Sequence, residues 1–247
     1  MNTTNNFKNI RRAFFLIPLF VSVCLGFTLL STAFCKEEAT HTAINSDAKK
    51  LPVLIIDAGH GGEDGGTVGK NGVFEKELNL KIAENLNALA LCSGYETVMT
   101  RSEDLLLYDR NVDFKGRKKA LDLLARVKIA EKYDDAIFIS IHMNAFPEER
   151  YSGLQVYYSK NHESSKIIAD EIQATVKNIL QPDNGRVTKP ADSSIFVLDR
   201  ITHPAVLIEC GFLSNEEECA LLSSEEYQKK LALVIFSALS KYIEAPT

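Results

Sequence analysis

The sequence VLIIDAGHGG at residues 53–62 decides the fold, because an apolar run leads directly into a polar, glycine-rich turn. Two later stretches repeat the pattern, IFISIH at residues 137–142 and AVLIE at residues 205–209. Unbroken apolar runs of this length are typical of strands that are buried on both faces of a parallel sheet. Polar residues that follow such strands gather at the carboxyl edge of the sheet, where open α/β sheets place their sites. Three residues are therefore expected together at that edge: His60, His142 and Glu209.

Strand-like and helix-like segments alternate along the rest of the chain. This alternation predicts an α/β fold with a single domain, in which helices flank both faces of a mostly parallel, twisted sheet. The expected strands are residues 53–57, 97–100, 137–141, 153–159, 195–198 and 205–208. The expected helices are residues 75–91, 118–133, 164–180 and 225–243. Polarity alternates within 153–159, which is typical of an edge strand.

The amino-acid composition limits the classes of protein to which the chain can belong. The chain has 247 residues, of which 45% are hydrophobic and 25% charged, which is enough apolar material for a sizeable core. The net charge is −5, so we expect no nucleic-acid partner. Beyond the N-terminal segment the cysteines are few and odd in number, which argues against a disulfide framework. Three cysteines are expected instead as small buried residues: Cys92, Cys210 and Cys219.

Residues 1–35 are expected to be a signal peptide or an N-terminal membrane anchor. Three basic residues precede an apolar stretch at residues 13–34, which is long for a signal peptide and nearly long enough to span a bilayer. The basic flank should stay inside, so the rest of the chain is exported, and it is held at the membrane if the segment is not cleaved. Residues 36–50 are polar and predict a linker, and residues 51–247 predict the folded domain.

The glycine-rich stretch at residues 59–66 has a nucleotide-binding loop as its rival interpretation. It contains neither G-x-x-x-x-G-K-[ST] nor G-x-G-x-x-G in register. The next expected helix begins well downstream, so no helix N-terminus is ready to receive a phosphate. The glycines are expected to let the backbone turn tightly around a ligand at His60, and a purely structural turn is the alternative.

The settings of His60 and His142 indicate a metal site, although either residue alone could be a hydrogen-bonded structural histidine. Small or amide residues follow both, which leaves space above each imidazole for a metal and a substrate. A catalytic zinc takes three protein ligands and keeps one position open for water. Glu75 is the candidate third ligand, and stabilisation of a helix N-terminus is its alternative role. Spacing leaves three other carboxylates open: Glu63, Asp64 and Glu77.

Five motifs stand in the order and spacing of a known family: VLIIDAGHGGEDGG, GVFEKELNL, SIHMNA, GLQVYY and PAVLIECGFLSN. Over residues 52–243 the chain resembles the zinc-dependent N-acetylmuramoyl-L-alanine amidases. The resemblance implies that residues 51–247 are a zinc amidase domain, which cuts the amide between muramic acid and L-alanine in peptidoglycan. It also implies that Glu209 is the catalytic glutamate. Three residues would hold the Zn²⁺ ion: His60, Glu75 and His142.

Two arginines belong to the same resemblance. Arg101 stands where the family commonly has an arginine after a strand. Arg126 stands in an Arg-x-x-x-Ala arrangement that the family commonly follows with asparagine, and here Glu131 takes that place. An ion pair with an arginine at the sheet edge is the alternative role for Glu209.

The overall plan resembles the germination-specific amidases of spore-forming bacteria, which combine an export segment with a catalytic domain and have no separate wall-binding module. The resemblance implies a role in the spore cortex, in muramic-δ-lactam formation and germination. The segment after His142 has no room for the helix that blocks the site in some relatives. Control is therefore expected from elsewhere, from the timing of expression, from location or from an accessory protein that the sequence does not name. A zinc peptidase that cuts within the stem peptide and a non-catalytic wall-binding module are the alternative functions.

Overall fold

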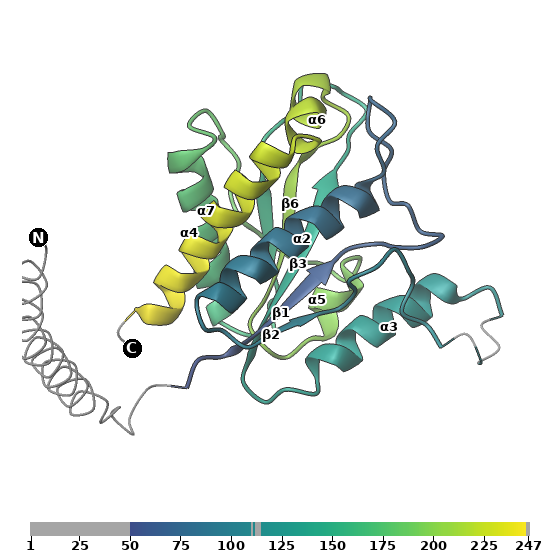
Figure 1. Cartoon of the computed structure of the whole chain (residues 1–247), viewed down its shortest axis with the longest axis vertical. Helices are drawn as coiled ribbons and strands as arrows, with labels where there is room; N and C mark the ends of the chain where they lie inside the picture. The colour runs from purple at the N-terminus through teal and green to yellow at the C-terminus, as the bar shows by residue number, and fades with distance from the viewer. Residues whose placement is uncertain (1–49, 110, 112–114, 246–247) are drawn as a thin grey trace, which may run out of the picture. The chain divides into compact units, whose positions relative to one another are not determined.

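A six-stranded sheet forms the centre of the structure, a computed structural model that describes residues 50–109, 111 and 115–245 (Figure 1). The strands are β1 (Val53–Ala58), β2 (Thr97–Met99), β3 (Ala136–Asn144), β4 (Gln155–Tyr158), β5 (Lys189–Pro190) and β6 (Ala205–Phe212). Their order across the sheet is β2-β1-β3-β6-β4-β5. Strands β2, β1, β3 and β6 are parallel, whereas β4 is antiparallel to β6 and parallel to β5.

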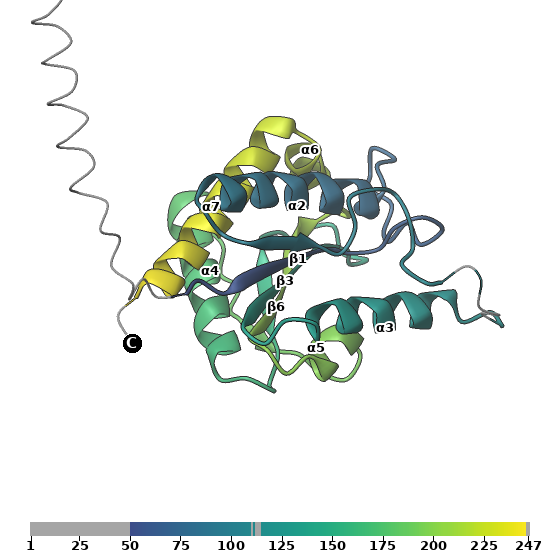
Figure 2. The same ribbon diagram turned by 60° about the horizontal axis from the view of Figure 1, so that its bottom comes forward.

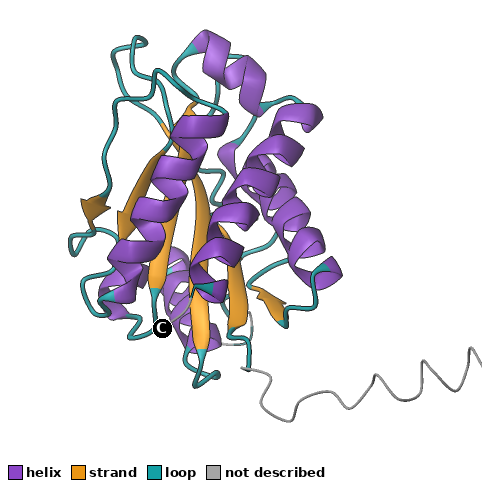
Figure 3. Ribbon diagram, turned by 90° about the vertical axis from the view of Figure 1, so that its left-hand side faces the viewer, coloured by secondary structure: helices purple, strands orange, loops and turns teal. Residues whose placement is uncertain are grey.

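Helices cover both faces of this sheet, as Figures 2 and 3 show from two further directions. One face packs against α2 (Glu75–Cys92), α4 (Ser164–Ile179) and α7 (Glu225–Glu244). The other packs against α3 (Lys118–Ala130) and the short α5 (Phe196–Arg200). A further short helix, α6 (Glu216–Leu222), follows β6. The prediction of a single-domain α/β fold, with a mostly parallel sheet between helices, is confirmed.

Successive residues of β1 supply the two apolar cores of the protein in turn. Leu54 and Ile56 belong to the core under α2, α4 and α7, whereas Val53 and Ile55 belong to the core under α3 and α5. This alternation follows from the period of two in a strand, and it explains why every residue of β1 is buried. The apolar run at residues 53–57 is therefore correctly interpreted as a doubly covered strand.

The predicted strand at residues 195–198 is wrong, because helix α5 occupies this segment. The carbonyl of Asp192 accepts a hydrogen bond from the Ile195 N–H at 3.1 Å, in a turn that leads into the helix. Val197 and Leu198 then fill the core on the α3 side of the sheet. β-Branched and aromatic residues favour strands where they can pack in a sheet, and here packing against α3 decides the outcome.

The predicted edge strand at residues 153–159 is a strand over a shorter range, but it is not at the edge. Strand β5 pairs with Tyr157 and Tyr158 on its outer side. A two-residue strand that contains proline carries no strand signal in the sequence, so hydrophobic periodicity could not predict β5. Among the cysteines, Cys210 and Cys219 are buried as predicted, whereas Cys92, the last residue of α2, is exposed.

The expected export segment at residues 1–35 and the linker at residues 36–50 lie outside the described residues, except for Lys50. Leu51–Thr247 forms one compact unit by itself. In the part of the chain that the structure describes, no helix combines the length and the apolar character that a membrane span requires.

A buried charge network joins α3 to the sheet. Arg126 of α3 contacts Asp57 of β1 through Nη1, and its Nε donates to Asp122 at 2.8 Å. Asp57 also accepts hydrogen bonds from Thr100 Oγ1 at 2.7 Å and from Ser140 Oγ at 2.6 Å. Burial alone would raise the pKa of Asp57, but Arg126 and the two hydroxyls hold it below its usual value. The carboxylate is therefore charged and fully partnered.

Replacement of Arg126 by methionine should destabilise the protein strongly, because it leaves Asp57 as a buried charge without its cation. We expect Arg126→Met to lower the free energy of unfolding by about 3–5 kcal/mol, measured by urea denaturation. Lys128→Met, at an exposed position of the same helix, is the matched control and should change the free energy by less than about 0.5 kcal/mol. A loss below about 1 kcal/mol in Arg126→Met would show that the charge pair does not hold α3 to the sheet.

Candidate active site

The turn after β1 presents His60 at the carboxyl edge of the sheet. His60 has a φ of 59°, in the left-handed region that side chains rarely adopt. Two arginines bind the carbonyl groups of this turn. Arg101 donates to Ala58 O and Gly59 O, each at 2.9 Å, and Arg126 donates to Ala58 O at 2.8 Å and to His60 O at 2.7 Å. The guanidinium groups therefore hold the unusual backbone that orients His60.

Glu75, the first residue of α2, is buried between the two histidines. Its Oε1 lies 3.2 Å from His60 Nε2 and 3.0 Å from His142 Nδ1. The same oxygen accepts a hydrogen bond from Met143 N at 3.0 Å, and Oε2 accepts one from Thr67 N at 2.9 Å. Burial alone would raise the pKa of Glu75, but the two histidines hold it far below its usual value. The residue is thus an anion that both imidazoles face.

His142 lies within β3, and its imidazole occupies space that only a glycine at position 59 leaves open. A Cβ atom on Gly59 would stand 2.1 Å from His142 Nε2. The rings of His60 and His142 meet edge to face, with their centroids 4.9 Å apart. The close approach of β3 to the turn after β1 therefore depends on the missing side chain of Gly59.

The three donor atoms of His60, Glu75 and His142 all lie within 4.8 Å of one another. A tetrahedral metal with bonds of about 2.0–2.1 Å needs ligand atoms roughly 3.3 Å apart, which small side-chain shifts supply. Asp64 does not join this group, although its Oδ1 lies 3.0 Å from His60 Nδ1. Glu63, paired with Lys118, and the exposed Glu77 also lie outside it. The donor set of two imidazoles and one carboxylate suits zinc.

Glu209 lies on β6, directly beside His142 in the strand pairing. Its Oε2 is buried, and within the described residues this oxygen has no hydrogen-bond partner and the carboxylate forms no ion pair. Burial raises the pKa of Glu209 to about 7, and the charge of Glu75 adds to this effect, while the two histidines oppose it. A carboxyl group with this pKa can accept and return a proton near neutral pH.

Asn79 is a residue of the site that the sequence interpretation did not identify. Its amide donates to Gly59 O at 3.1 Å and to Glu75 Oε1 at 3.3 Å, and its side chain is fully buried. Asn79 stands one helical turn after Glu75, on the face of α2 that otherwise holds buried apolar residues such as Leu78 and Ile82. A polar residue on an apolar helix face is the signal that could have revealed it.

Two imidazoles and a carboxylate that could hold a metal ion converge beside a buried glutamate at the carboxyl edge of an α/β sheet, an arrangement that is typical of hydrolases. The chain belongs to the N-acetylmuramoyl-L-alanine amidase family, whose profile matches residues 54–241. The predicted family is therefore confirmed, and the protein is an amidase of the hydrolase class.

Individual relatives agree with this assignment. The chain is 33% identical over 235 residues to the germination-specific N-acetylmuramoyl-L-alanine amidase of Bacillus subtilis, covering 90% of this chain and 93% of that protein. The structure resembles that of the CwlD amidase from Clostridioides difficile, solved in complex with the GerS lipoprotein, with a TM-score of 0.73 and 40% identity over 77% of this chain and 98% of that one. It also resembles the amidase AmiC2 of Nostoc punctiforme, with a TM-score of 0.66 and 30% identity over 78% and 98%.

A side chain at position 59 should disrupt metal binding. We expect Gly59→Ala to weaken the affinity for Zn²⁺ by at least about tenfold, measured by competition with a chromogenic chelator, because the new methyl group displaces His142. Gly185→Ala is the matched control, since a Cβ there meets no atom within 4 Å. Unchanged affinity in Gly59→Ala would mean that His142 does not contribute to the metal site.

Proposed function

We propose that the protein is a zinc-dependent enzyme that hydrolyses the amide bond between N-acetylmuramic acid and L-alanine in peptidoglycan. The observation that carries the proposal is the convergence of His60, Glu75 and His142 within 4.8 Å, beside Glu209 with its unpartnered Oε2. Membership of the amidase family supports the choice of bond. In this proposal the three converging residues are the zinc ligands and Glu209 is the catalytic residue.

Zinc, Glu209 and the residues that position the ligands have different roles in the proposed reaction. When bound, zinc supplies Lewis-acid activation of water and of the scissile carbonyl. Glu209 accepts the proton of the attacking water and delivers it to the leaving amine of L-alanine. Its raised pKa of about 7 suits both transfers. Arg126 and Asn79 hold His60 and Glu75 in position, so that the site needs little rearrangement when substrate binds.

We further propose that the enzyme acts outside the cytoplasmic membrane, on peptidoglycan of the spore cortex. The likeness to a germination-specific amidase along 90% of the chain supports the spore role. The predicted export segment at residues 1–35 supports the location, either secreted or tied to the outer side of the membrane. Removal of stem peptides there would prepare muramic acid for conversion to muramic-δ-lactam.

An accessory protein is part of the proposal. The segment between β3 and β4, residues 145–154, contains no helix that could block the site. The Clostridioides difficile amidase was solved in complex with a lipoprotein. We therefore propose that a separate exported protein of this kind regulates the enzyme.

Digestion of purified muropeptides tests the proposed bond. The zinc-loaded protein should release intact stem peptides with a free L-alanine amine, identified by mass spectrometry, and a chelator should abolish the release until zinc is restored. New ends within the stem peptide would instead indicate a zinc peptidase. Binding without any cleavage would indicate a wall-binding module, and full activity of the metal-free protein would contradict the zinc dependence.

Substitution of Glu209 tests its catalytic role. Glu209→Gln keeps the shape of the side chain but removes the base, so we expect kcat to fall by about 10²–10⁴-fold while zinc content stays at one ion per chain. Glu217→Gln, at an exposed position of α6, is the control and should retain full kcat. A near-normal kcat in Glu209→Gln would exclude the residue as the base, and loss of zinc would indicate a ligand instead.

A further inference from the structure

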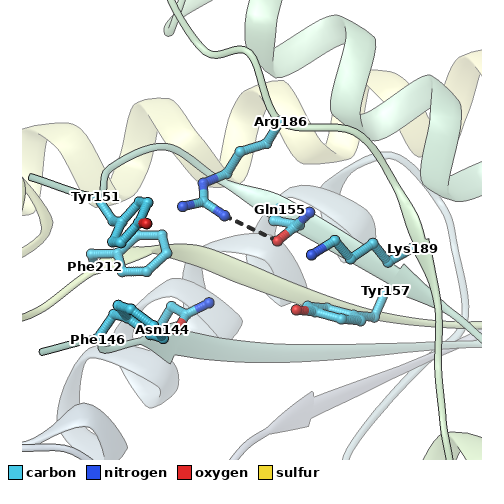
Figure 4. A pocket seen from close by; sticks show the side chains of 8 residues that line it. All are labelled: Asn144, Phe146, Tyr151, Gln155, Tyr157, Arg186, Lys189 and Phe212. Carbon is cyan, nitrogen blue, oxygen red and sulfur yellow. Dashed lines mark hydrogen bonds between the residues drawn. The ribbon is translucent and has the colours of Figure 1, made fainter. Parts of the chain in front are cut away.

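A cavity of about 240 Å³ lies beside the candidate active site, over β4 and β5 (Figure 4). One of its lining residues, Gln155, is the pairing partner of Glu209 in the sheet, so the cavity begins one strand, about 4.8 Å, away from Glu209. Pockets for whole small ligands commonly measure about 300–1,000 Å³. The smaller cavity therefore suits one portion of an extended substrate.

Two cations define the chemistry of this cavity. Figure 4 shows the charged ends of Arg186 and Lys189 and the hydroxyl of Tyr157 pointing into the same space. Among the described residues, no carboxylate lies within ion-pair distance of either cation. The nearby carboxylate of Glu218 already accepts hydrogen bonds from two backbone amides, those of Gly153 at 2.8 Å and Phe212 at 2.7 Å. The cavity is therefore a local positive site on a chain of net charge −5.

Arg186 is held in position before any ligand arrives. Its Nε donates to Ser152 O at 2.8 Å, its Nη1 donates to Gln155 Oε1 at 3.1 Å, and its guanidinium lies 4.3 Å from the ring centre of Phe212. Its Nη2 makes no hydrogen bond to a described residue. A fixed guanidinium with a free donor pair is well suited to bind a carboxylate, because little side-chain freedom remains to be lost.

The strand order sets the direction in which a substrate would lie. Strands β3, β6, β4 and β5 are neighbours in that order. They carry, in the same order, His142, Glu209, Gln155 and Lys189. In the proposed function Glu209 protonates the leaving amine of L-alanine, so the stem peptide departs from the Glu209 side of the scissile bond, toward β4. One residue spans at most about 3.6 Å, so the residue after L-alanine reaches the cavity.

We propose that this cavity is the subsite for an acidic stem-peptide residue directly after L-alanine, and that Arg186, assisted by Lys189, binds its free carboxylate. The inference rests on the proposed amidase function and adds its peptide specificity. The carboxyl group of muramic acid is consumed in the scissile amide, and the remaining sugar groups are neutral, so the glycan offers these cations no matching charge. The enzyme thereby selects peptides by the charge of their second residue.

Matched substrates test this assignment. Muramyl tripeptides are prepared with D-glutamate as the second residue, its α-carboxyl group either free or amidated, and a second pair differs only in amidation of the C-terminal carboxyl group. We expect the zinc-loaded full-length protein to favour the free D-glutamate substrate by about 10–100-fold in kcat/KM, and to be indifferent to the C-terminal change. Arg186→Gln should lose this preference, by a fall on the acidic substrate alone.

Two controls separate recognition from structure. A purely structural role of Arg186 would lower kcat/KM equally on the acid and the amide, and that result would overturn the proposal, as would an unchanged preference in Arg186→Gln. Lys229→Gln, on the exposed face of α7, should leave both substrates unaffected. If no substrate is cut, the amidase function fails, and calorimetry with the two tripeptides of the first pair, prepared without the sugar, decides the subsite separately. Equal affinity for these two peptides would then refute it.

Discussion

The contact between Arg126 and Asp57 is the constraint on which the rest of the site depends. Asp57 is a buried residue of β1, and Arg126 reaches it from α3, so the pair fixes one covering helix to the central strands. The same guanidinium binds the His60 carbonyl, and Arg101 binds the two carbonyls before it. A non-glycine residue in the left-handed region costs about 1–3 kcal/mol, and it keeps this conformation only where its surroundings enforce it. The two arginines supply that enforcement, and His60 faces the cluster as a result.

Close approach of backbone and side chains completes the arrangement. Gly59 leaves room for the imidazole of His142, and Glu75 brings the start of α2 against both histidines. Each contact joins a different pair of elements, so the donor cluster exists only in the folded chain. Glu209 does not take part in these contacts: its Oε2 has no hydrogen-bond partner in the part of the chain that the structure describes, and burial raises its pKa to about 7. An unsatisfied buried carboxyl is costly to the fold but useful for proton transfer.

Much of this arrangement could be predicted from sequence, for physical reasons. Long apolar runs identify doubly buried strands, and the polar residues that follow these runs, such as His60 and Glu209, share one edge of the sheet. Helix α5 and strand β5 could not be predicted, because tertiary packing and one short pairing decide them. Spacing alone left Glu75 as one of four candidate carboxylates for the third ligand. Only the folded chain brings Glu75, at the start of α2, against both histidines. The cavity around Arg186 arises from segments that only the fold brings together.

The location of bound zinc tests most directly whether these contacts build a zinc site. Crystals of the zinc-loaded protein, measured on both sides of the zinc absorption edge, give an anomalous difference map that depends on no assumption about activity. We expect one peak at about 2.0–2.2 Å from donor atoms of His60, Glu75 and His142, with an open side facing Glu209. A peak bound elsewhere, or one coordinated by Glu209 in place of Glu75, would contradict it.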